Sequence, residues 1–397
     1  MELLRRARTR AMAVARAEQL KPLRVAYRAV RDQINKAIPR RRHPPLATLW
    51  KLKPRLPYGL VVEPTTACNA KCVFCPVSLR DDSFVANHLE HEVLDRLLAE
   101  LKTWPALPGF FQMVGLGEPT VARNFAKNLQ RIREAIPKTW RIALNTNGTT
   151  LHSDKVVDGI IGVVDGLTIS INGHDEESYQ LLNGIPGFQA TLDKAAAFLE
   201  RKNDGGYRTP ATRVQIMRSK YENKAALGAF AEKITPLLAE ADIIHRQPLQ
   251  TLAGVEDPIG KLQTDEDKAS EAVINDVAIP CLQVWWNAFI TAEGDVYPCC
   301  IAGNVDGREA RKNTELYLGN LRETSLEDIW NGEARAEIMR QHLTDRKVAF
   351  CKHCPNPTEY DTSHWKLIEK HARALDAMPS GTKTPSARER RHLPIAG

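Results

Sequence analysis

Residues 61–76 of the chain read VVEPTTACNAKCVFCP. A β-branched run leads directly into three cysteines, Cys68, Cys72 and Cys75, which have the spacing C-x3-C-x2-C. Thiolates packed this closely after a strand suit an iron–sulfur cluster, which cysteine sulfur holds preferentially. A [4Fe–4S] cube has four irons and this stretch offers three ligands. One iron is therefore left open for another ligand.

The length and composition predict a folded cytoplasmic protein with one large domain and a smaller one. The chain has 397 residues, of which 43% are hydrophobic and 26% charged, as is ordinary for a globular protein. We find no apolar run of membrane-spanning length and no signal-peptide pattern. Eight cysteines in such a chain are more typical of metal ligands than of disulfides.

The positive charge is concentrated at the N-terminus. Residues 1–56 hold 16 Lys and Arg against 3 Asp and Glu, which leaves 39 basic and 45 acidic residues in the remainder. Apolar residues recur at helical spacing from Leu23 to Ile38, so we expect a basic helical arm that ends in a Pro-rich linker. Two interpretations stay open: residues 1–42 lie on an anionic membrane surface, or the helix packs on the acidic body. Nucleic-acid binding is not expected, since few aromatics accompany the charge.

From Tyr58 onward, short β-branched runs alternate with longer helical stretches. This alternation predicts an α/β fold with a parallel sheet, here a partial (β/α)6 barrel over residues 57–250. Functional residues are then expected at the carboxyl ends of the strands, where the cysteine loop also lies. Strands are predicted over 59–63, 110–114, 141–145, 167–171, 213–217 and 243–245, and helices over 88–103, 124–136, 153–162, 187–203 and 224–239.

The chain after the barrel is predicted to form a linker, a small domain and a tail. Residues 251–280 are polar and acidic, which indicates a linker or lid. Residues 281–379 predict a small α+β domain, with a hairpin over 287–299, a helix that begins after Ser325 and a final helix over 359–378. The Pro-, Gly- and Arg-containing tail, 380–397, is expected to be disordered.

A second motif follows the cysteines at the end of the second predicted strand, where residues 114–119 read VGLGEP. Together with the C-x3-C-x2-C spacing, it resembles the radical S-adenosylmethionine (SAM) enzymes over roughly residues 58–248. The resemblance implies that SAM binds the open iron of a [4Fe–4S] cluster. It also implies that the SAM amino group is held by the turn formed by Gly115, Gly117, Glu118 and Pro119.

In this family, other SAM contacts come from the ends of the third and fourth strands. The alternative is that these residues only cap turns, as Asn and Ser commonly do. Residues 182–184 read LNG where many relatives carry an Arg thought to bind the SAM carboxylate, and Arg218 is the candidate for that role here. The matching residues at the two strand ends are Asn145, Asn147, Ser170 and Asn172.

The C-terminal domain contains a second set of cysteines. With the sequences YLGNL at 317–321 and LEDIW at 326–330, the set resembles a SPASM/twitch domain, which implies an auxiliary [4Fe–4S] cluster. Cys299 and Cys300 are adjacent; Cys299 is the expected ligand and Cys300 is the alternative. A structural zinc site is the other interpretation of four such cysteines. The expected ligands are Cys281, Cys299, Cys351 and Cys354.

The resemblance implies a 5′-deoxyadenosyl radical that abstracts a hydrogen atom from a substrate, with flavodoxin or ferredoxin as electron donor. We expect a dehydrogenase-like oxidoreductase acting on a carbohydrate, a cyclitol or a lipid-linked polar substrate. Two alternatives are a maturase that modifies a ribosomally made peptide and a non-catalytic Fe–S or zinc scaffold. His174, His245 and Arg246 are the candidate catalytic residues, because each follows or ends a predicted strand.

Overall fold

The computed structural model describes residues 46–249, 256–268, 280–305, 308–344, 349–352 and 362–378. The predicted basic arm up to residue 45, with the proposed membrane surface of residues 1–42, lies outside the described residues. So do Cys354 and the predicted tail, 380–397. No helix within the described ranges has both the length and the apolar character needed to cross a membrane.

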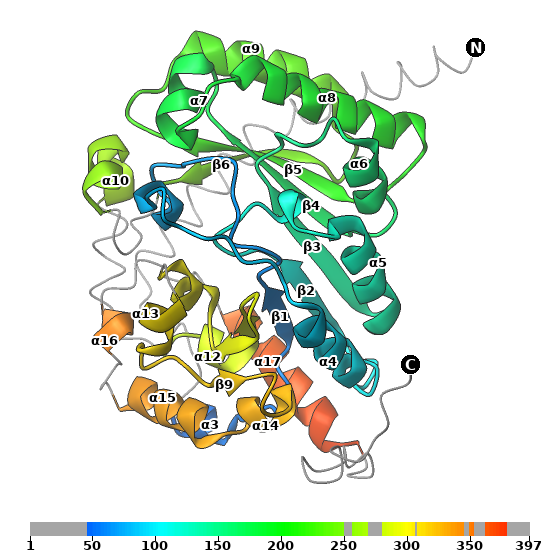
Figure 1. Ribbon diagram of the computed structural model, residues 1–397, viewed down its shortest axis with the longest axis vertical. Coiled ribbons are helices and arrows are strands. Elements are labelled where there is room, and N and C mark those ends of the chain that lie inside the picture. Colours follow the sequence, from blue (N-terminus) through cyan, green and yellow to red (C-terminus); the bar gives the residue numbers. More distant parts are fainter. Residues whose placement is uncertain are drawn as a thin grey trace. The chain divides into compact units, whose positions relative to one another are not determined.

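Six parallel strands form the main sheet and lie in sequence order, so the α/β prediction with a parallel sheet is confirmed (Figure 1). Neighbouring strands pair in simple register, for example Phe111 of β2 with Ile142 of β3, except at an irregularity between Ser170 and Asn172 of β4. The six strands are β1 (Gly59–Val62), β2 (Gly109–Met113), β3 (Trp140–Thr146), β4 (Gly166–Asn172), β5 (Ala211–Arg218) and β6 (Ile243–Pro248).

Helices between the strands cover one side of this sheet (Figure 1). All five predicted helices are present, and the structure adds α7, which begins at a capping box formed by Asp175 and Ser178. The helices are α4 (His91–Leu101), α5 (Phe125–Ala135), α6 (Asp154–Ile160), α7 (Glu176–Asn183), α8 (Phe188–Asp204) and α9 (Lys224–Ile234).

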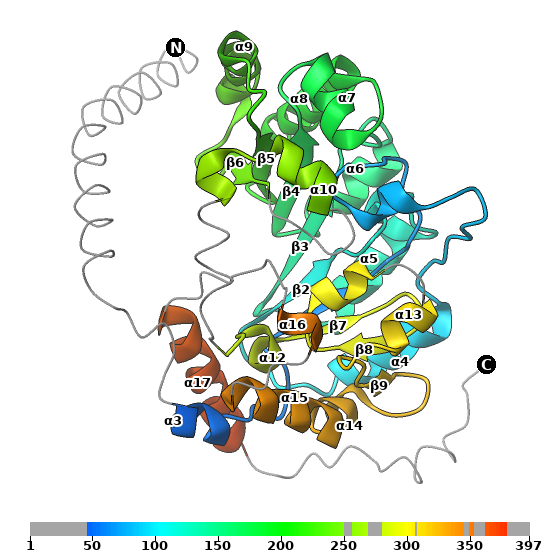
Figure 2. The ribbon, with the colours of Figure 1, turned by 90° about the vertical axis from the view of Figure 1, so that its left-hand side faces the viewer.

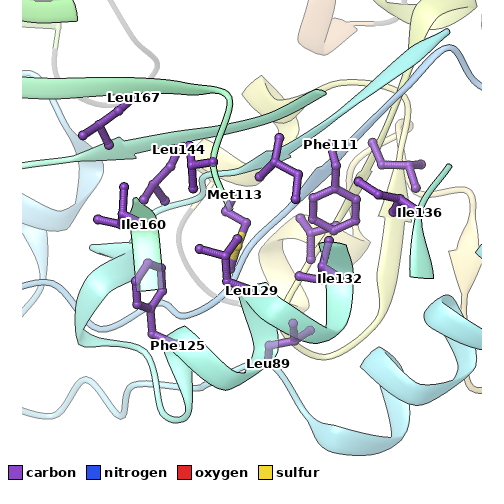
Figure 3. Packing of buried hydrophobic residues seen from close by; sticks show 14 of the residues in the cluster. Leu89, Phe111, Met113, Phe125, Leu129, Ile132, Ile136, Leu144, Ile160 and Leu167 are labelled. Carbon is purple, nitrogen blue, oxygen red and sulfur yellow. The ribbon is translucent and has the colours of Figure 1, made fainter. Parts of the chain in front are cut away.

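Alternation along the strands gives the sheet one apolar face and one polar face. Phe111 and Met113 of β2 and Leu144 of β3 are fully buried against the helices, where Leu129 of α5 meets them (Figure 3). Apart from Asn172 at the end of β4, the intervening residues of β3 to β6 point to the opposite face and are half-buried or exposed. That opposite face is called the concave face below. In Figure 2 the concave face is turned toward the viewer. Three helices lie on this side of the strands: α10 (Glu256–Leu262), α12 (Gln283–Trp286) and α16 (Ala349–Lys352).

The C-terminal module extends the same sheet. Strand β7 (Asn287–Ile290) pairs in parallel with β1 on the side away from β2, with Gly59 opposite Asn287. Strands β8 (Asp295–Tyr297) and β9 (Gly319–Asn320) continue it in antiparallel pairing, and Gly294 turns the predicted hairpin at a φ of +87°. The auxiliary module and the barrel therefore share one nine-stranded sheet.

Residues 46–56, which were expected to belong to the arm and linker, pack into the C-terminal module. Helix α3 (Leu46–Lys51) lies beside α15 (Glu333–Leu343) in both ribbon views (Figures 1 and 2). The indole N–H of Trp285 donates to the carbonyl of Leu49 over 3.3 Å, and that of Trp330 donates to the carbonyl of Pro54 over 2.9 Å. The described residues also form α13 (Arg308–Lys312), α14 (Leu326–Trp330) and α17 (Thr362–Asp376). As predicted, Ser325 caps α14 by accepting from the N–H of Asp328.

Candidate functional site

The cysteine loop, residues 68–75, follows β1 and is anchored on the end of α7. The N–H of Lys71 donates to the carbonyl of Asn183 over 3.0 Å, and the N–H of Val73 donates to the carbonyl of Leu182 over 3.0 Å. The LNG segment in which many relatives carry an Arg thus has a different task here. Its backbone fixes the loop between the first and third cysteines.

The three thiols of this loop lie close enough to affect one another's ionisation. Burial, with smaller contributions from nearby Glu118 and Cys75, raises the pKa of Cys68 to about 11. Burial also raises the pKa of Cys72 well above its usual range, with added repulsion from Cys75 and Cys68. Positively charged iron offsets this repulsion, because a thiolate is the form that binds metal. The donor set therefore fits a cluster.

The turn at residues 115–119 is built directly against the cysteine loop. The N–H of Glu118 donates to the carbonyl of Ala67 over 2.8 Å. A Cβ at Gly117 would lie 2.2 Å from the carbonyl oxygen of Thr65 and 2.5 Å from that of Ala67. Only glycine fits this position, which supports the close approach that the motif predicts.

The carboxylate of Glu118 is buried and joins the end of β2 to the end of β3. It accepts from the N–H and the hydroxyl of Thr120, from the hydroxyl of Thr146 over 2.7 Å and from the N–H of Asn147 over 2.7 Å. Burial raises the pKa of Glu118, against the lowering effect of these hydrogen bonds. Oε1 of Glu118 thus accepts three of these hydrogen bonds and Oε2 accepts one, and the predicted contact of Glu118 with the SAM amino group stays a prediction.

Asn147 connects β3 to the cysteine loop. Its Nδ2 donates to Oδ1 of Asn69 over 2.8 Å, and Nδ2 of Asn69 donates to the hydroxyl of Thr149 over 2.8 Å. Asn147 thereby positions the loop, and its predicted contact with SAM stays a prediction.

Asn145 and Ser170 point to the concave face and are half-buried. Within the described part of the chain, neither side chain has a hydrogen-bond partner, so both polar groups are available to a ligand. Ser170 pairs in register with Gln215 of β5, which pairs with His245 of β6. Residues paired in register across parallel strands face the same side. Ser170, Gln215 and His245 therefore line one continuous strip on the concave face.

Asn172 and Asn183 form a buried link behind the cysteine loop. Asn172 has a φ of +64° at an irregularity in β4, and its Nδ2 donates to Oδ1 of Asn183 over 2.8 Å. The same oxygen lies 3.5 Å from Sγ of Cys72, and Nδ2 of Asn183 donates to the carbonyl of Ile171 over 2.8 Å. Sequence analysis missed Asn183, although an Asn-Gly pair after a helix is a recognisable turn signal.

Arg218 forms an ion pair with the buried carboxylate of Asp267. Residues 256–268, which contain Asp267, also pack over the first cysteine loop: Ile259 and Leu262 share a hydrophobic cluster with Leu182, Leu249, Val73, Phe74 and Met217. The SAM carboxylate would have to share Arg218 with Asp267. The role proposed for Arg218 therefore remains a prediction.

The described cysteines of the C-terminal module gather around Cys299. Burial raises the pKa of Cys299 well above its usual range, and Cys300, Cys281 and Cys351 each raise it further, in that order. Both members of the adjacent pair thus lie at the site. Cys354 lies outside the described residues, and among those described no three Cys, His, Asp or Glu side chains are arranged to hold a single metal ion. The N–H of Cys281 donates to Nδ1 of His342 over 3.3 Å, a partner that sequence analysis missed.

The three candidate catalytic residues lie in different places. The His174 side chain is 1% exposed, and its Nε2 accepts from the N–H of Asn223 over 2.9 Å, so it anchors the turn before α9. Arg246 is exposed and pairs with Glu222. Only His245 shares the strip that contains Ser170 and Gln215, and its Nε2 lies 2.8 Å from Oε1 of Gln247.

Two family models match the chain. The model of the radical SAM superfamily matches residues 62–215, and that of SPASM, an iron–sulfur cluster-binding domain, matches residues 281–355. The chain is a radical SAM enzyme with a SPASM domain. It therefore contains a [4Fe–4S] cluster that binds SAM and an auxiliary cluster. The SPASM match also favours a cluster over the zinc site that four cysteines alone left open.

Two curated proteins are similar over most of their length. A PqqA peptide cyclase from Xanthomonas euvesicatoria pv. vesicatoria is 29% identical over 345 residues, covering 75% of this chain and 80% of that protein. The tungsten-containing aldehyde ferredoxin oxidoreductase cofactor-modifying protein of Pyrococcus furiosus is 23% identical over 310 residues, covering 69% and 81%.

Solved structures share the fold. Streptococcus suis SuiB bound to S-adenosylmethionine has a TM-score of 0.51 at 17% identity, covering 78% of this chain and 75% of SuiB. SuiB bound to precursor peptide SuiA has a TM-score of 0.50 at 16% identity, covering 74% and 69%.

These relatives correct one prediction. The expected dehydrogenase-like oxidoreductase on a carbohydrate, cyclitol or lipid-linked substrate is wrong, because the similar proteins are named as a peptide cyclase and a cofactor-modifying protein. The scaffold alternative also fails, since the chain is a radical SAM enzyme. The error arose because no motif in the sequence distinguishes sugar from peptide.

Proposed function

We propose that the chain is a radical SAM maturase that modifies a residue within a ribosomally made peptide. The observation that carries this proposal is the similarity to PqqA peptide cyclase, which extends over 75% of this chain and 80% of the relative. The aligned 345 residues reach far beyond the radical SAM domain at residues 62–215. The likeness therefore includes more than the part that generates the radical.

The cysteine loop would hold the first cluster through Cys68, Cys72 and Cys75. When bound, this cluster and SAM supply a 5′-deoxyadenosyl radical that abstracts a hydrogen atom. The chain's own task is to position SAM and the substrate and to keep water away. The turn at 115–119 offers backbone groups to SAM, and the half-buried Asn145 and Ser170 offer polar side chains.

The concave face suits an extended peptide. Four half-buried residues on it carry primary amides, each with one acceptor oxygen and two donor hydrogens. Such side chains can pair with the alternating N–H and carbonyl groups of a peptide backbone. The four residues are Gln112, Asn145, Gln215 and Gln247.

His245 is the proton acceptor that this geometry supports best. If its Nε2–H donates to Oε1 of Gln247, the neutral ring presents Nδ1 as the free acceptor. His245 lies beside Gln215 in the sheet register, so it borders the face proposed for the peptide.

The auxiliary cluster would be held by Cys281, by Cys299 or Cys300, and by Cys351 and Cys354. Flavodoxin or ferredoxin is the electron donor that we propose for the first cluster. Ile259 and Leu262, which pack against Val73 and Phe74 of the cysteine loop, help to exclude water from it.

The experiment combines the anaerobically reconstituted enzyme with synthetic precursor peptides encoded by genes beside its own. We expect 5′-deoxyadenosine to form together with a peptide of altered mass, located to one residue by tandem mass spectrometry. Cys72→Ala is the matched control and should give neither product. SAM cleavage that no such peptide stimulates, and that alters none of them, would contradict the proposal.

A further inference from the structure

A buried carboxylate lies between the SAM-binding turn at 115–119 and the C-terminal module and contacts both. Glu63, which directly follows β1, is 0% exposed. Its Oε1 accepts from the N–H of Leu116 over 3.0 Å, inside the turn at 115–119. A Cβ at Gly115 would lie 2.3 Å from Cγ of Glu63, so the turn rests directly on this side chain.

The other oxygen of Glu63 faces the C-terminal module. Its Oε2 accepts from Nη1 of Arg311 over 3.2 Å and from the N–H of Ala292 over 3.4 Å. The Arg311 side chain is only 3% exposed, and its Nη2 lies 3.9 Å from Oε2 of Glu293, which is 5% exposed. One buried guanidinium therefore lies between two buried carboxylates from different parts of the chain.

Glu293 also connects, through Asn87, to the segment that precedes Cys68. Its Oε1 accepts from Nδ2 of Asn87 over 2.6 Å. The carbonyl of Asn87 accepts from the hydroxyl of Thr65 over 2.8 Å and from the N–H of Thr66 over 2.9 Å. Arg311 thus reaches the segment before Cys68 through Glu293, and the SAM-binding turn through Glu63.

The guanidinium stays charged in this position. Burial alone lowers the pKa of Arg311, but Glu63 and Glu293 outweigh burial and raise the pKa above its usual value. Two carboxylates held this close without Arg311 would repel each other, and a buried charge left unpaired is strongly destabilising. Burial raises the pKa of Glu63 and Arg311 lowers it, so loss of the guanidinium would either protonate Glu63 or move Glu63, Glu293 or both.

We propose that Arg311 is a positioning residue for SAM binding: it holds Glu63 and Glu293 together, so that the turn at 115–119 and the segment before Cys68 take their binding positions only against the docked SPASM module. Arg311 itself touches neither cysteine set among the contacts of the described residues. Its effect reaches SAM through the backbone at Leu116 and through Asn87.

The test measures SAM affinity on anaerobically reconstituted full-length protein, by calorimetry and by the change that SAM causes in the EPR signal of the reduced first cluster. Arg311→Met should weaken SAM binding roughly tenfold, the lower end of the effect of losing a hydrogen-bond partner of a metal ligand, because Arg311 acts through Glu63 and Glu293. Arg308→Met is the matched control. Arg308 lies on the same short helix and pairs with Asp295, so its loss should leave SAM affinity unchanged.

A triple variant, E63Q/E293Q/R311M, separates positioning from simple charge compensation. It leaves no unpaired buried charge, and the amide oxygen introduced by E63Q can still accept from the N–H of Leu116. The guanidinium link is lost, together with the long contact of 3.4 Å from the N–H of Ala292. We expect normal iron content and thermal stability with weakened SAM binding, whereas wild-type SAM affinity in this variant would overturn the proposal. If the triple variant does not load its clusters, Arg311→Lys decides, because it keeps the charge but loses the planar fork. It should bind SAM more weakly than wild type, and equal binding would overturn the proposal.

Discussion

The backbone N–H of Glu118 donates to the carbonyl of Ala67 over 2.8 Å, so the turn after β2 is attached to the residue that precedes Cys68. Gly117 lies in the same contact and has no room for a side chain. The turn at 115–119, which we propose binds SAM, and the first cysteine loop are therefore one structural unit. A substitution in the turn should therefore disturb the cysteine loop, and a substitution in the loop should disturb the turn.

Gly117→Ala tests this unit. The new methyl group would lie 2.2 Å from the carbonyl oxygen of Thr65, so the turn must move away from the cysteine loop. We expect SAM affinity to fall roughly tenfold or more, with a lowered melting temperature. Gly166→Ala is the control, because nothing lies within 4 Å of a Cβ at Gly166. Equal SAM binding in both variants would contradict the argument.

The two cysteine sets should separate in a mutational test. Alanine at Cys68, Cys72 or Cys75 should abolish SAM cleavage, whereas alanine at Cys281 or Cys351 should leave uncoupled cleavage and abolish peptide modification. Each change should remove about four of about eight irons, measured by chemical iron analysis. Loss of cleavage in both groups would show that the auxiliary cluster supports the first one.

Chemical iron analysis also decides which of the adjacent Cys299 and Cys300 is the ligand of the auxiliary cluster. Both cysteines are half-buried, but it is Cys299 whose pKa burial, Cys300, Cys281 and Cys351 all raise, so Cys299→Ala should lose the auxiliary irons while Cys300→Ala keeps them. The reverse result assigns Cys300 as the ligand.

The six parallel strands could be predicted because they are short runs rich in β-branched or aromatic residues, and burial of one face imposes a visible alternation on β2 to β5. The pairing of β7 with β1 could not, since Gly59 and Asn287 are distant in sequence and no local pattern reports the contact. Helix α7 was missed because it is short and lies between a strand and a longer helix.

Part of the candidate site could likewise be predicted from the sequence, and part could not. Cysteine spacing and the VGLGEP motif are local signals, so the sequence alone identifies both. The partners that position them are long-range: Glu63 meets Arg311 across 248 residues and Asn172 meets Asn183 across a helix. His174 was expected at the open rim, yet the structure buries it, because strand ends do not indicate which side chains point inward.

His245→Gln tests the proposed proton acceptor. The change removes the Nδ1 acceptor while keeping a polar group on the concave face of β6. We expect SAM cleavage to persist and peptide modification to fall by about 10²-fold, a common effect of losing a general base. Arg246→Gln is the control, because Arg246 follows His245 on the opposite face and pairs with Glu222. Unchanged product formation in His245→Gln would exclude this role, and the ratio of modified peptide to 5′-deoxyadenosine is the measurement.

Lys202 and Asp242 form an ion pair that supports the sheet beneath β5. Both side chains are essentially unexposed, at 0% and 1%, and Asp242 also accepts from the N–H of Thr212 over 2.7 Å. Lys202→Met leaves that carboxylate buried without its cation, so we expect a loss of about 3–5 kcal/mol in the free energy of unfolding. The neighbouring Arg201 pairs with Asp158 at the surface, where the two side chains are 43% and 64% exposed. Arg201→Met should therefore cost less than about 1 kcal/mol.

Chemical denaturation of the two variants checks the difference, and a double variant tests its cause. K202M/D242N removes the unpaired charge and should recover part of the stability that Lys202→Met loses. If the double variant is no more stable than Lys202→Met, lost packing of the lysine stem explains the effect and the unpaired charge does not.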